Sequence, residues 1–280
     1  MSRAAGEQAF LARLGTGPAG GASLVRGAVL LARTQCPDAD PDRVEAMIGE
    51  AAVAIRRKAA GDPSALHRAR ALGEVLAGER GLRGDRGDYD DPRNSCLECV
   101  LDRRLGVPLA LSLLWMEAGR RAGWTVEGVG LPGHFVVRVH GAKAESVLAD
   151  PFHGGVVRSK EELKDLLQGI HGKSVPLRPR DLQAMQPLDV LLRMLRNLRN
   201  SYRKRGDRAR AIAVADDMLL LVPGLPEALR DRGLLRLEGG ERRGGLADLR
   251  AFLAHTPRAS DADAILRLVT LVTDNAEMPN

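Results

Sequence analysis

The sequence has 280 residues, of which 44% are hydrophobic, 28% are charged and only 3% are aromatic, and it carries a formal net charge of +6. A chain of this length can bury one large core or two ordinary ones, and a core of Leu, Val and Ala favours helices over an all-β sandwich. Three cysteines are too few for a disulfide framework, and the longest apolar run, Val107–Met116, is too short to span a bilayer.

The basic charge of the chain does not by itself indicate nucleic-acid binding. Most of the 42 basic residues are arginines, and they are interleaved with 36 acidic residues instead of forming one patch. Residues 1–21 lack the apolar run of a signal peptide. We therefore expect a cytoplasmic protein without membrane or nucleic-acid partners.

Apolar side chains at helical spacing predict five helices in the first 122 residues. They cover Ser23–Arg33, a segment begun by Asp40-Pro41, a segment begun by Asp62-Pro63, Ser95–Leu105 and the strongly apolar Val107–Ala122. Pro is favoured at the first helical position because it has no amide hydrogen to leave unpaired there. Residues 83–94 are rich in Gly, Asp and Pro, which predicts a polar loop.

Short apolar runs separated by Gly and Pro replace the helical pattern after residue 125. The runs 126–131, 135–139 and 146–149 predict strands, which we expect to form a small antiparallel sheet. A further helix follows the sheet, because Ser159 and Glu162 have the spacing of a capping box.

Near its C-terminal end the chain repeats itself with a period of 34 residues. The matching pairs are Gly206 and Gly240, Ala213 and Ala247, Leu219 and Leu253, Pro223 and Pro257, and Ala228 and Ala262. This period is typical of tetratricopeptide repeats, in which two antiparallel helices meet at a tight turn. Three prolines between residues 173 and 187 precede the repeat. We therefore expect one domain over residues 1–180 and helical repeats over residues 181–280.

The helix that leads into the repeat carries four arginines at steps of three and four residues, so that they share one face. They are Arg193, Arg196, Arg199 and Arg203. One interpretation is a solvated outer face. The other is a docking surface, chiefly for an acidic protein partner, which makes these four residues partner-binding candidates.

Three segments in the middle of the chain could carry chemistry. Residues 103–112 open the apolar helix, residues 130–138 place His134 at the start of a strand, and residues 148–155 end a strand in Asp150. In this order they resemble the core of the transglutaminase-like superfamily, a papain-like arrangement of nucleophilic Cys, proton-accepting His and orienting Asp. The resemblance implies that His134 and Asp150 are the catalytic pair. It also places the nucleophile position at Pro108, which cannot attack.

The whole chain more closely resembles the SirB family of bacterial proteins, a transglutaminase-like domain followed by tetratricopeptide repeats. The matching stretches are Asp91–Ser95, Leu105–Pro108, Gly128–Phe135 and Asp150–Gly155. The resemblance covers roughly residues 25 to 270. It implies that Pro at the nucleophile position is usual in the family and that no established activity is carried over. Cys96 and Cys99 are departures of this chain from the family.

Each candidate residue also has a structural interpretation. His134 and Asp150 are either a buried pair that holds two strands in register or a residual catalytic or ligand-binding pair. Ser112 lies one turn after Pro108 and can face the same cleft, but its hydroxyl lacks an activating base. His153 is expected on a loop. Asn94 is expected to cap the following helix before it serves a site.

No metal and no cofactor are expected. Cys96 and Cys99 have metal-ligand spacing, but there is no second Cys pair and no His close after them, so two helical thiols are the favoured interpretation. The sequence also has neither a Gly-rich phosphate loop nor a dinucleotide-binding fingerprint.

Together these features predict an α+β protein with a helix-rich transglutaminase-like (papain-like) core, a small antiparallel sheet and C-terminal helical repeats. We expect a pseudoenzyme that binds a protein or peptide in the former active-site cleft, with the repeats as a second contact surface. The cleft candidates are Asn94, Pro108, Ser112 and His153. The alternative is a cysteine-protease-like or amide hydrolase that uses His134 and Asp150 with an unidentified nucleophile.

Overall fold

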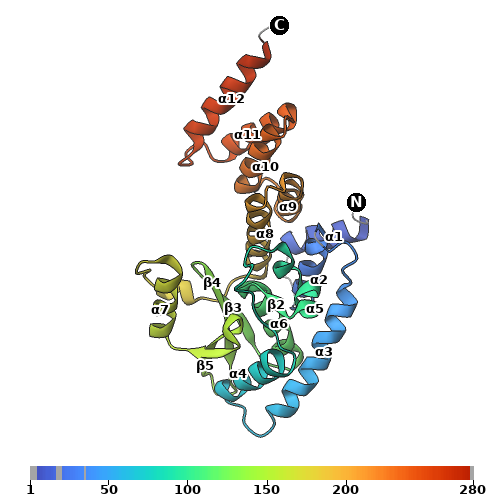
Figure 1. The fold of residues 1–280 in the computed structure, drawn as a ribbon, viewed down its shortest axis with the longest axis vertical. Helices are drawn as coiled ribbons and strands as arrows, with labels where there is room; N and C mark the ends of the chain where they lie inside the picture. The colour runs from blue at the N-terminus through green and yellow to red at the C-terminus, as the bar shows by residue number, and fades with distance from the viewer. Residues whose placement is uncertain (1–4, 17–20, 35, 278–280) are drawn as a thin grey trace. The chain divides into compact units, whose positions relative to one another are not determined.

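The computed structural model describes residues 5–16, 21–34 and 36–277 (Figure 1). These residues contain twelve α-helices, a two-stranded sheet and a four-stranded antiparallel sheet. The predicted α+β class is confirmed. The chain forms two compact units: one holds α1 and the helices from Leu195 onward, and the other holds α2 to Met194. Among the described residues, no helix combines the length and the apolar character needed to cross a membrane.

Five α-helices of the second unit precede the larger sheet, close to the predicted positions. They are α2 (Gly21–Leu31), α3 (Pro41–Lys58), α4 (Ala65–Gly73), which continues as the π-helix η2 (Glu74–Glu79), α5 (Leu97–Arg103) and α6 (Pro108–Arg121). Asp40 caps α3 as expected, since its carboxylate accepts the N–H of Asp42. The helix predicted from Asp62-Pro63 instead begins at Ala65, because the Ser64 hydroxyl accepts the N–H of His67 and caps α4 there.

The four-stranded sheet has the strand order β3-β4-β5-β6. Its strands are β3 (Val126–Leu131), β4 (His134–His140), β5 (Ser146–Asp150) and β6 (Val156–Arg158). The first three were expected from the sequence. The fourth is only three residues long and lies at the sheet edge, where Val156 is exposed. It therefore lacks the alternating apolar pattern from which a strand is predicted. A separate parallel pair joins β1 (Arg83–Gly84) to β2 (Leu105–Gly106).

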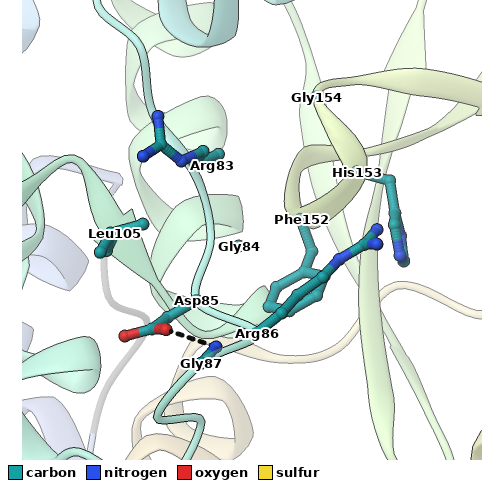
Figure 2. A pocket seen from close by; sticks show the side chains of 9 residues that line it. All are labelled: Arg83, Gly84, Asp85, Arg86, Gly87, Leu105, Phe152, His153 and Gly154. Atoms are coloured by element: carbon teal, nitrogen blue, oxygen red, sulfur yellow. Dashed lines mark hydrogen bonds between the residues drawn. The ribbon is translucent and has the colours of Figure 1, made fainter.

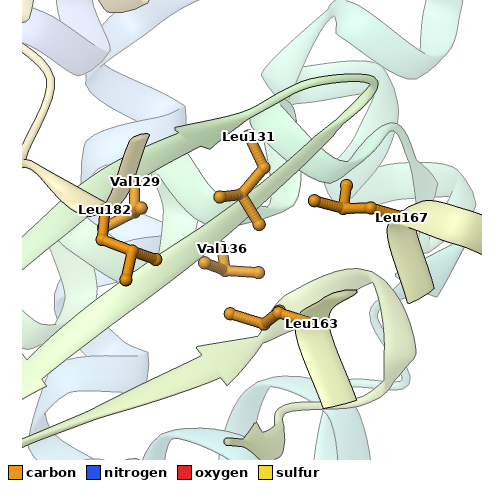
Figure 3. Close-up of a cluster of buried hydrophobic side chains, with 6 residues drawn as sticks. All are labelled: Val129, Leu131, Val136, Leu163, Leu167 and Leu182. Atoms are coloured by element: carbon orange, nitrogen blue, oxygen red, sulfur yellow. The ribbon is translucent and has the colours of Figure 1, made fainter. Parts of the chain in front are cut away.

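One face of the larger sheet is covered by α7 (Lys160–His171) and by the short helix η5 (Pro179–Leu182). Figure 3 shows the apolar cluster that these two helices form with the sheet, which consists of Val129, Leu131, Val136, Leu163, Leu167 and Leu182. Val129 and Val136 are register partners on neighbouring strands, so they project from the same face. The capping box predicted for α7 is present, with Ser159 and Glu162 each bonded to the other's backbone N–H.

The other face of the sheet packs against α6, which explains why that helix is apolar on nearly all sides. Glycines allow the close approach. A Cβ at Gly128 would lie 2.7 Å from the ring of Phe135 and 3.1 Å from the sulfur of Met116 on α6. The second half of α6 is thereby held close against the sheet.

The repeat unit confirms the 34-residue period. Its helices are α9 (Arg208–Leu221), α10 (Pro226–Glu238), α11 (Arg242–His255) and α12 (Ala262–Glu277), and α1 (Ala5–Thr16) packs against α9. The bounds of α9 and α11 differ by one repeat period. Gly206 and Gly240, which precede these two helices, have φ angles of 72° and 82°. The left-handed conformation at both turns is the physical reason for the repeated glycine.

Pairs of arginine and aspartate hold the helices of the repeat unit together. Arg199 on α8 (Pro187–Lys204) lies 2.7 Å from Asp231, and both side chains are buried. Arg232 and Arg236 both bind Asp248, at 2.6 and 2.7 Å.

The predicted partner-binding face of α8 is therefore corrected. Arg199 is buried against Asp231, and Arg196 is bound to Glu227 at 2.6 Å. Arg193 is bound to the backbone carbonyls of Leu131 and His134, which lie in the same unit as Arg193. Of the four predicted arginines, only Arg203 is exposed. The helical spacing predicts that the four arginines share one face. Part of that face is buried, and acidic residues distant in the sequence pair with Arg196 and Arg199 there.

Replacing Asp231 with Asn is expected to destabilise the repeat unit by roughly 3 kcal/mol, because it leaves Arg199 as a buried cation without its counterion. Urea unfolding combined with hydrogen exchange in α9 and α10 measures the effect. Arg203→Ala is the matched control on the same helix as Arg199, and it should change stability by less than about 0.5 kcal/mol. Equal effects of the two substitutions would contradict the assignment.

Candidate functional site

Two histidines converge on one buried carboxylate where β4 begins and β5 ends. The Nε2 atom of His134 lies 3.0 Å from Oδ2 of Asp150, and Nδ1 of His153 lies 2.7 Å from the same oxygen. Asp150 is completely buried and His134 is 3% exposed. The Nε of Arg158 lies 3.8 Å from that oxygen, so three basic groups surround a single carboxylate.

The strand register explains why His134 and Asp150 meet. Val137 pairs with Ala149, so one step further along the ladder Val136 faces Asp150. His134 lies two residues before Val136 and therefore projects from the same face of the sheet as Asp150. Diagonal neighbours of this kind are within reach of long side chains. The predicted pairing of His134 and Asp150 is thus a consequence of the hairpin.

Local turns fix both residues. Before His134, the chain turns through Pro132 and Gly133, and the φ of +68° at Gly133 suits the second central position of a type II turn. After Asp150, the short helix η4 (Pro151–His153) begins, and Oδ1 of Asp150 caps it by accepting the N–H of His153 at 3.3 Å. Asp150 therefore uses one oxygen for the backbone and the other for the two imidazoles.

The protonation of the cluster follows from the charge of Asp150. Burial acts to raise the pKa of Asp150, but the hydrogen bonds and charges of His134 and His153 outweigh it and hold that pKa below its usual value. An ionised carboxylate only accepts hydrogen bonds. His134 must therefore donate through Nε2, and His153 must donate through Nδ1.

Arg193 positions the turn that carries His134. Its guanidinium donates to the carbonyl oxygens of Leu131 and His134, each at 2.6 Å, and lies 5.4 Å from the centre of the Phe135 ring. Charge-assisted hydrogen bonds to two carbonyls of one turn limit its movement. Arg193, predicted as a partner-binding residue, thus lies against the turn beneath the candidate site.

Nothing at the start of α6 resembles an activated nucleophile. Pro108 is the first residue of α6 and is buried. Ser112 is completely buried, and its hydroxyl has no hydrogen-bond partner among the described residues. Within residues 36–277, no hydroxyl or thiol forms a hydrogen bond with the His134 ring, whose bonded partner is Asp150.

Asn94 is buried and holds the polar loop in place. Its amide nitrogen donates to Oδ2 of Asp85 at 3.1 Å and to the carbonyl of Asp88 at 2.8 Å, and its amide oxygen accepts from Arg103 at 2.9 Å. It does not cap α5, because residues 92–95 form the separate turn η3 and Cys96 occupies the capping position. The amide is fully used by the fold.

An open depression lies beside the cluster, with a volume of about 500 Å³ (Figure 2). Its lining residues are Arg83, Gly84, Asp85, Arg86, Gly87, Leu105, Phe152, His153 and Gly154. Of the four predicted cleft residues, only His153 is among them. The ring of Phe152 lies 6.0 Å from that of His134 in an edge contact, and His134 itself does not line the depression.

Sequence reasoning missed Phe152 and the two arginines of this depression, Arg83 and Arg86. Phe152 packs on the backbone of Gly84, where a Cβ would lie 2.5 Å from its ring. The glycine in the polar loop and the aromatic residue after Asp150-Pro151 were both visible in the sequence. Their contact depends on the parallel pairing of β1 with β2, which two-residue strands do not reveal.

The three cysteines form a second group, which the sequence did not predict. Cys36 and Cys99 form a disulfide, and Cys96 is a buried free thiol beside it. The sulfur atoms of all three lie within 4.8 Å of one another. Burial raises the pKa of the Cys96 thiol to about 11, so it is protonated at neutral pH and is a poor nucleophile.

Within the part of the chain that the structure describes, two groups have the composition of a metal site: the three cysteines, and His134 with Asp150 and His153. In the second group, both histidines already donate to the carboxylate, and Arg158 adds a positive charge nearby. The residues fit a hydrogen-bonded cluster better than a cation site.

Comparisons with known proteins agree with the fold. A family model described as the Transglutaminase-like superfamily matches residues 42–196, and one described as Tetratricopeptide repeat matches residues 198–270. A "UPF0162 protein" of Xylella fastidiosa is 35% identical over 245 residues, which cover 86% of this chain and 87% of that protein. No solved structure was found to match the chain.

More distant relatives extend the same similarity. A "UPF0162 protein" of Vibrio cholerae is 27% identical over 200 residues, covering 71% of this chain and 74% of that protein. "Protein SirB1" of Salmonella typhimurium is 25% identical over 183 residues, covering 65% of this chain and 68% of that protein. The predicted resemblance to SirB proteins is therefore confirmed.

Replacing Asp150 with Asn is expected to destabilise the fold at neutral pH by about 1–3 kcal/mol, because the buried imidazole of His134 and the half-buried imidazole of His153 lose a charged acceptor. The lowered pKa of Asp150 means that the ionised carboxylate stabilises the folded state above about pH 4. That contribution is lost as the pH falls through the lower folded-state pKa, so the difference between wild type and variant should shrink in acid.

Urea unfolding at a series of pH values between 7 and 3 measures this dependence. Asp38→Asn serves as the control, because Asp38 is exposed and its side chain has no partner among the described residues. A stability difference that stays constant down to pH 3 would show that Asp150 is not the ionised acceptor.

Proposed function

Because this chain belongs to the transglutaminase-like superfamily but has Pro108 where the resemblance places the nucleophile, we propose that it is a non-catalytic binding protein. It binds a peptide segment of a protein partner at the former active-site cleft, and its helical repeats provide a second contact surface. The proposal also assigns His134 and Asp150 a positioning role in place of a catalytic one.

The burial of His134 is the observation that carries this proposal. The ring is 3% exposed, is bonded to Asp150 and has Phe152 against its edge. A general base must come within hydrogen-bond reach of the group whose proton it takes. No described thiol or hydroxyl occupies that position, and a substrate in the depression would meet Phe152 and His153 first.

The charge of the depression favours an acidic ligand. Arg83 and Arg86 are exposed, and neither side chain has an ion-pair or hydrogen-bond partner among the described residues. His153 lies at the same depression and Phe152 supplies an apolar surface beside them, as Figure 2 shows. Guanidinium groups bind carboxylates through paired hydrogen bonds, so a peptide with acidic side chains next to an apolar one fits this chemistry.

The helical repeats support a second contact with protein. Tetratricopeptide repeats stack helix pairs into surfaces that commonly receive extended or helical partner segments. Exposed apolar residues on the last helix, Leu266 at 54% and Leu271 at 60%, are suited to such contact.

Purified protein is expected to show no transglutaminase, amidase or protease turnover that depends on His134. The measurement compares wild type with His134→Ala and with a variant in which all three cysteines are replaced by Ser. Turnover that is lost in His134→Ala but kept in the cysteine-free variant would establish a hydrolase with another nucleophile. Turnover lost in both variants would indicate a thiol enzyme. Either result overturns the non-catalytic assignment.

A photo-crosslinking amino acid placed at Arg86 is expected to trap a partner in cells, because Arg86 borders the depression. The same amino acid at Val53 is the control, since Val53 is 58% exposed on α3 of the same unit and does not line the depression. Adding Arg83→Glu should reduce the yield at position 86 by about tenfold for an acidic ligand, because it reverses a charge beside the site. Equal yields at the two positions would contradict binding at the depression.

A further inference from the structure

All three cysteines of this chain meet at one place, although Cys36 and Cys99 are 63 positions apart. The chain has no other cysteine, so the cluster is not explained by a large number of cysteines that meet by chance. Cys36 comes from the segment before α3, and Cys96 and Cys99 come from the start of α5. The cluster is separate from the His134, Asp150 and His153 group.

The segments that carry the cysteines are held together without the disulfide. Glu98 on α5 accepts the backbone N–H of Asp40 at 3.0 Å and a hydrogen bond from Arg43 at 2.5 Å. Arg43 also binds Asp102 at 2.7 Å. These contacts join the start of α3 to α5, so the three sulfur atoms stay close when the disulfide is reduced.

The backbone spacing is wider than a disulfide favours. The Cα atoms of Cys36 and Cys99 are 7.4 Å apart, whereas disulfide-bonded residues usually lie about 4.4–6.8 Å apart. A metal ion between two thiolates adds a bond of about 2.3 Å on each side. The wider spacing therefore suits two sulfur atoms that share an ion.

Cys96 is the capping residue of α5, and its side chain forms no hydrogen bond with the first turn of that helix. Its sulfur therefore gives up no such hydrogen bond when it binds an ion. Cys99 follows at the three-residue step that brings both sulfur atoms to one end of the helix.

We propose that the three reduced cysteines form a thiolate site for Zn²⁺, with a fourth position open to an exogenous ligand. On binding, three thiols release three protons and form three Zn–S bonds. The Cys36–Cys99 disulfide is the alternative state of the same residues and uses two of the three ligands, so the oxidised chain does not hold the ion. A thiol or phosphine reductant supplies the two electrons that break the S–S bond, and two protons from water complete the two thiols.

The test uses the full-length chain, reduced with a phosphine, freed of metal and titrated with Zn²⁺ against a chromogenic chelator. We expect one ion per chain, with the affinity lowered more than about tenfold in Cys96→Ser. Co²⁺ in place of Zn²⁺ should show the absorption of thiolate-to-metal charge transfer. His153→Ala is the control, because it changes the other potential metal group and should leave binding unchanged.

Because Cys96 is buried, Cys36→Ser serves as a second variant, and circular dichroism checks that each variant is folded. Wild-type protein before and after reduction needs no substitution at all: the oxidised form should not bind, and reduction should restore binding. Absence of stoichiometric binding by the reduced wild type, or binding as tight as the wild type's by folded Cys96→Ser or Cys36→Ser, overturns the proposal. Loss of binding in His153→Ala also overturns it, since the ion would then lie at the other group.

Discussion

A single buried carboxylate organises the centre of the transglutaminase-like unit. Asp150 caps η4 with one oxygen and accepts hydrogen bonds from His134 and His153 with the other. A buried charge is tolerated only when such partners compensate its loss of hydration. Asp150 therefore holds together the start of β4, the end of β5 and the helix η4 that follows β5. Their positions determine the shape of the depression beside Phe152.

The cluster contains two of the three groups of a nucleophile–base–orienter chain. In a nucleophile–base–orienter chain, the carboxylate orients a histidine whose other nitrogen faces the attacking group. Here the carboxylate and the histidine are in place, while α6 begins with Pro108 and the cysteines gather in a group of their own. The pair joins the start of β4 to the end of β5, which gives it a structural role in the fold.

Much of the fold could be predicted from the sequence because its signals are local. The Asp40 cap, the Ser159 capping box and the repeated glycines at 206 and 240 each act within a few residues. The ion-pair partners of the arginines on α8 could not be predicted, because Arg199 pairs with Asp231, which lies 32 positions away in the sequence. The depression depends on two-residue strands, and the cysteine group depends on Cys36 reaching α5. Both are products of tertiary packing.

The most direct test of the central claim is the protonation of the two histidines, read from long-range ¹H–¹⁵N spectra of protein labelled at histidine. Since Asp150 is ionised and only accepts, we expect a hydrogen on Nε2 of His134 and a hydrogen on Nδ1 of His153, with both signals altered in Asp150→Asn. A His134 ring with a bare Nε2 and a hydrogen on Nδ1 would contradict the shared-carboxylate arrangement on which the rest depends.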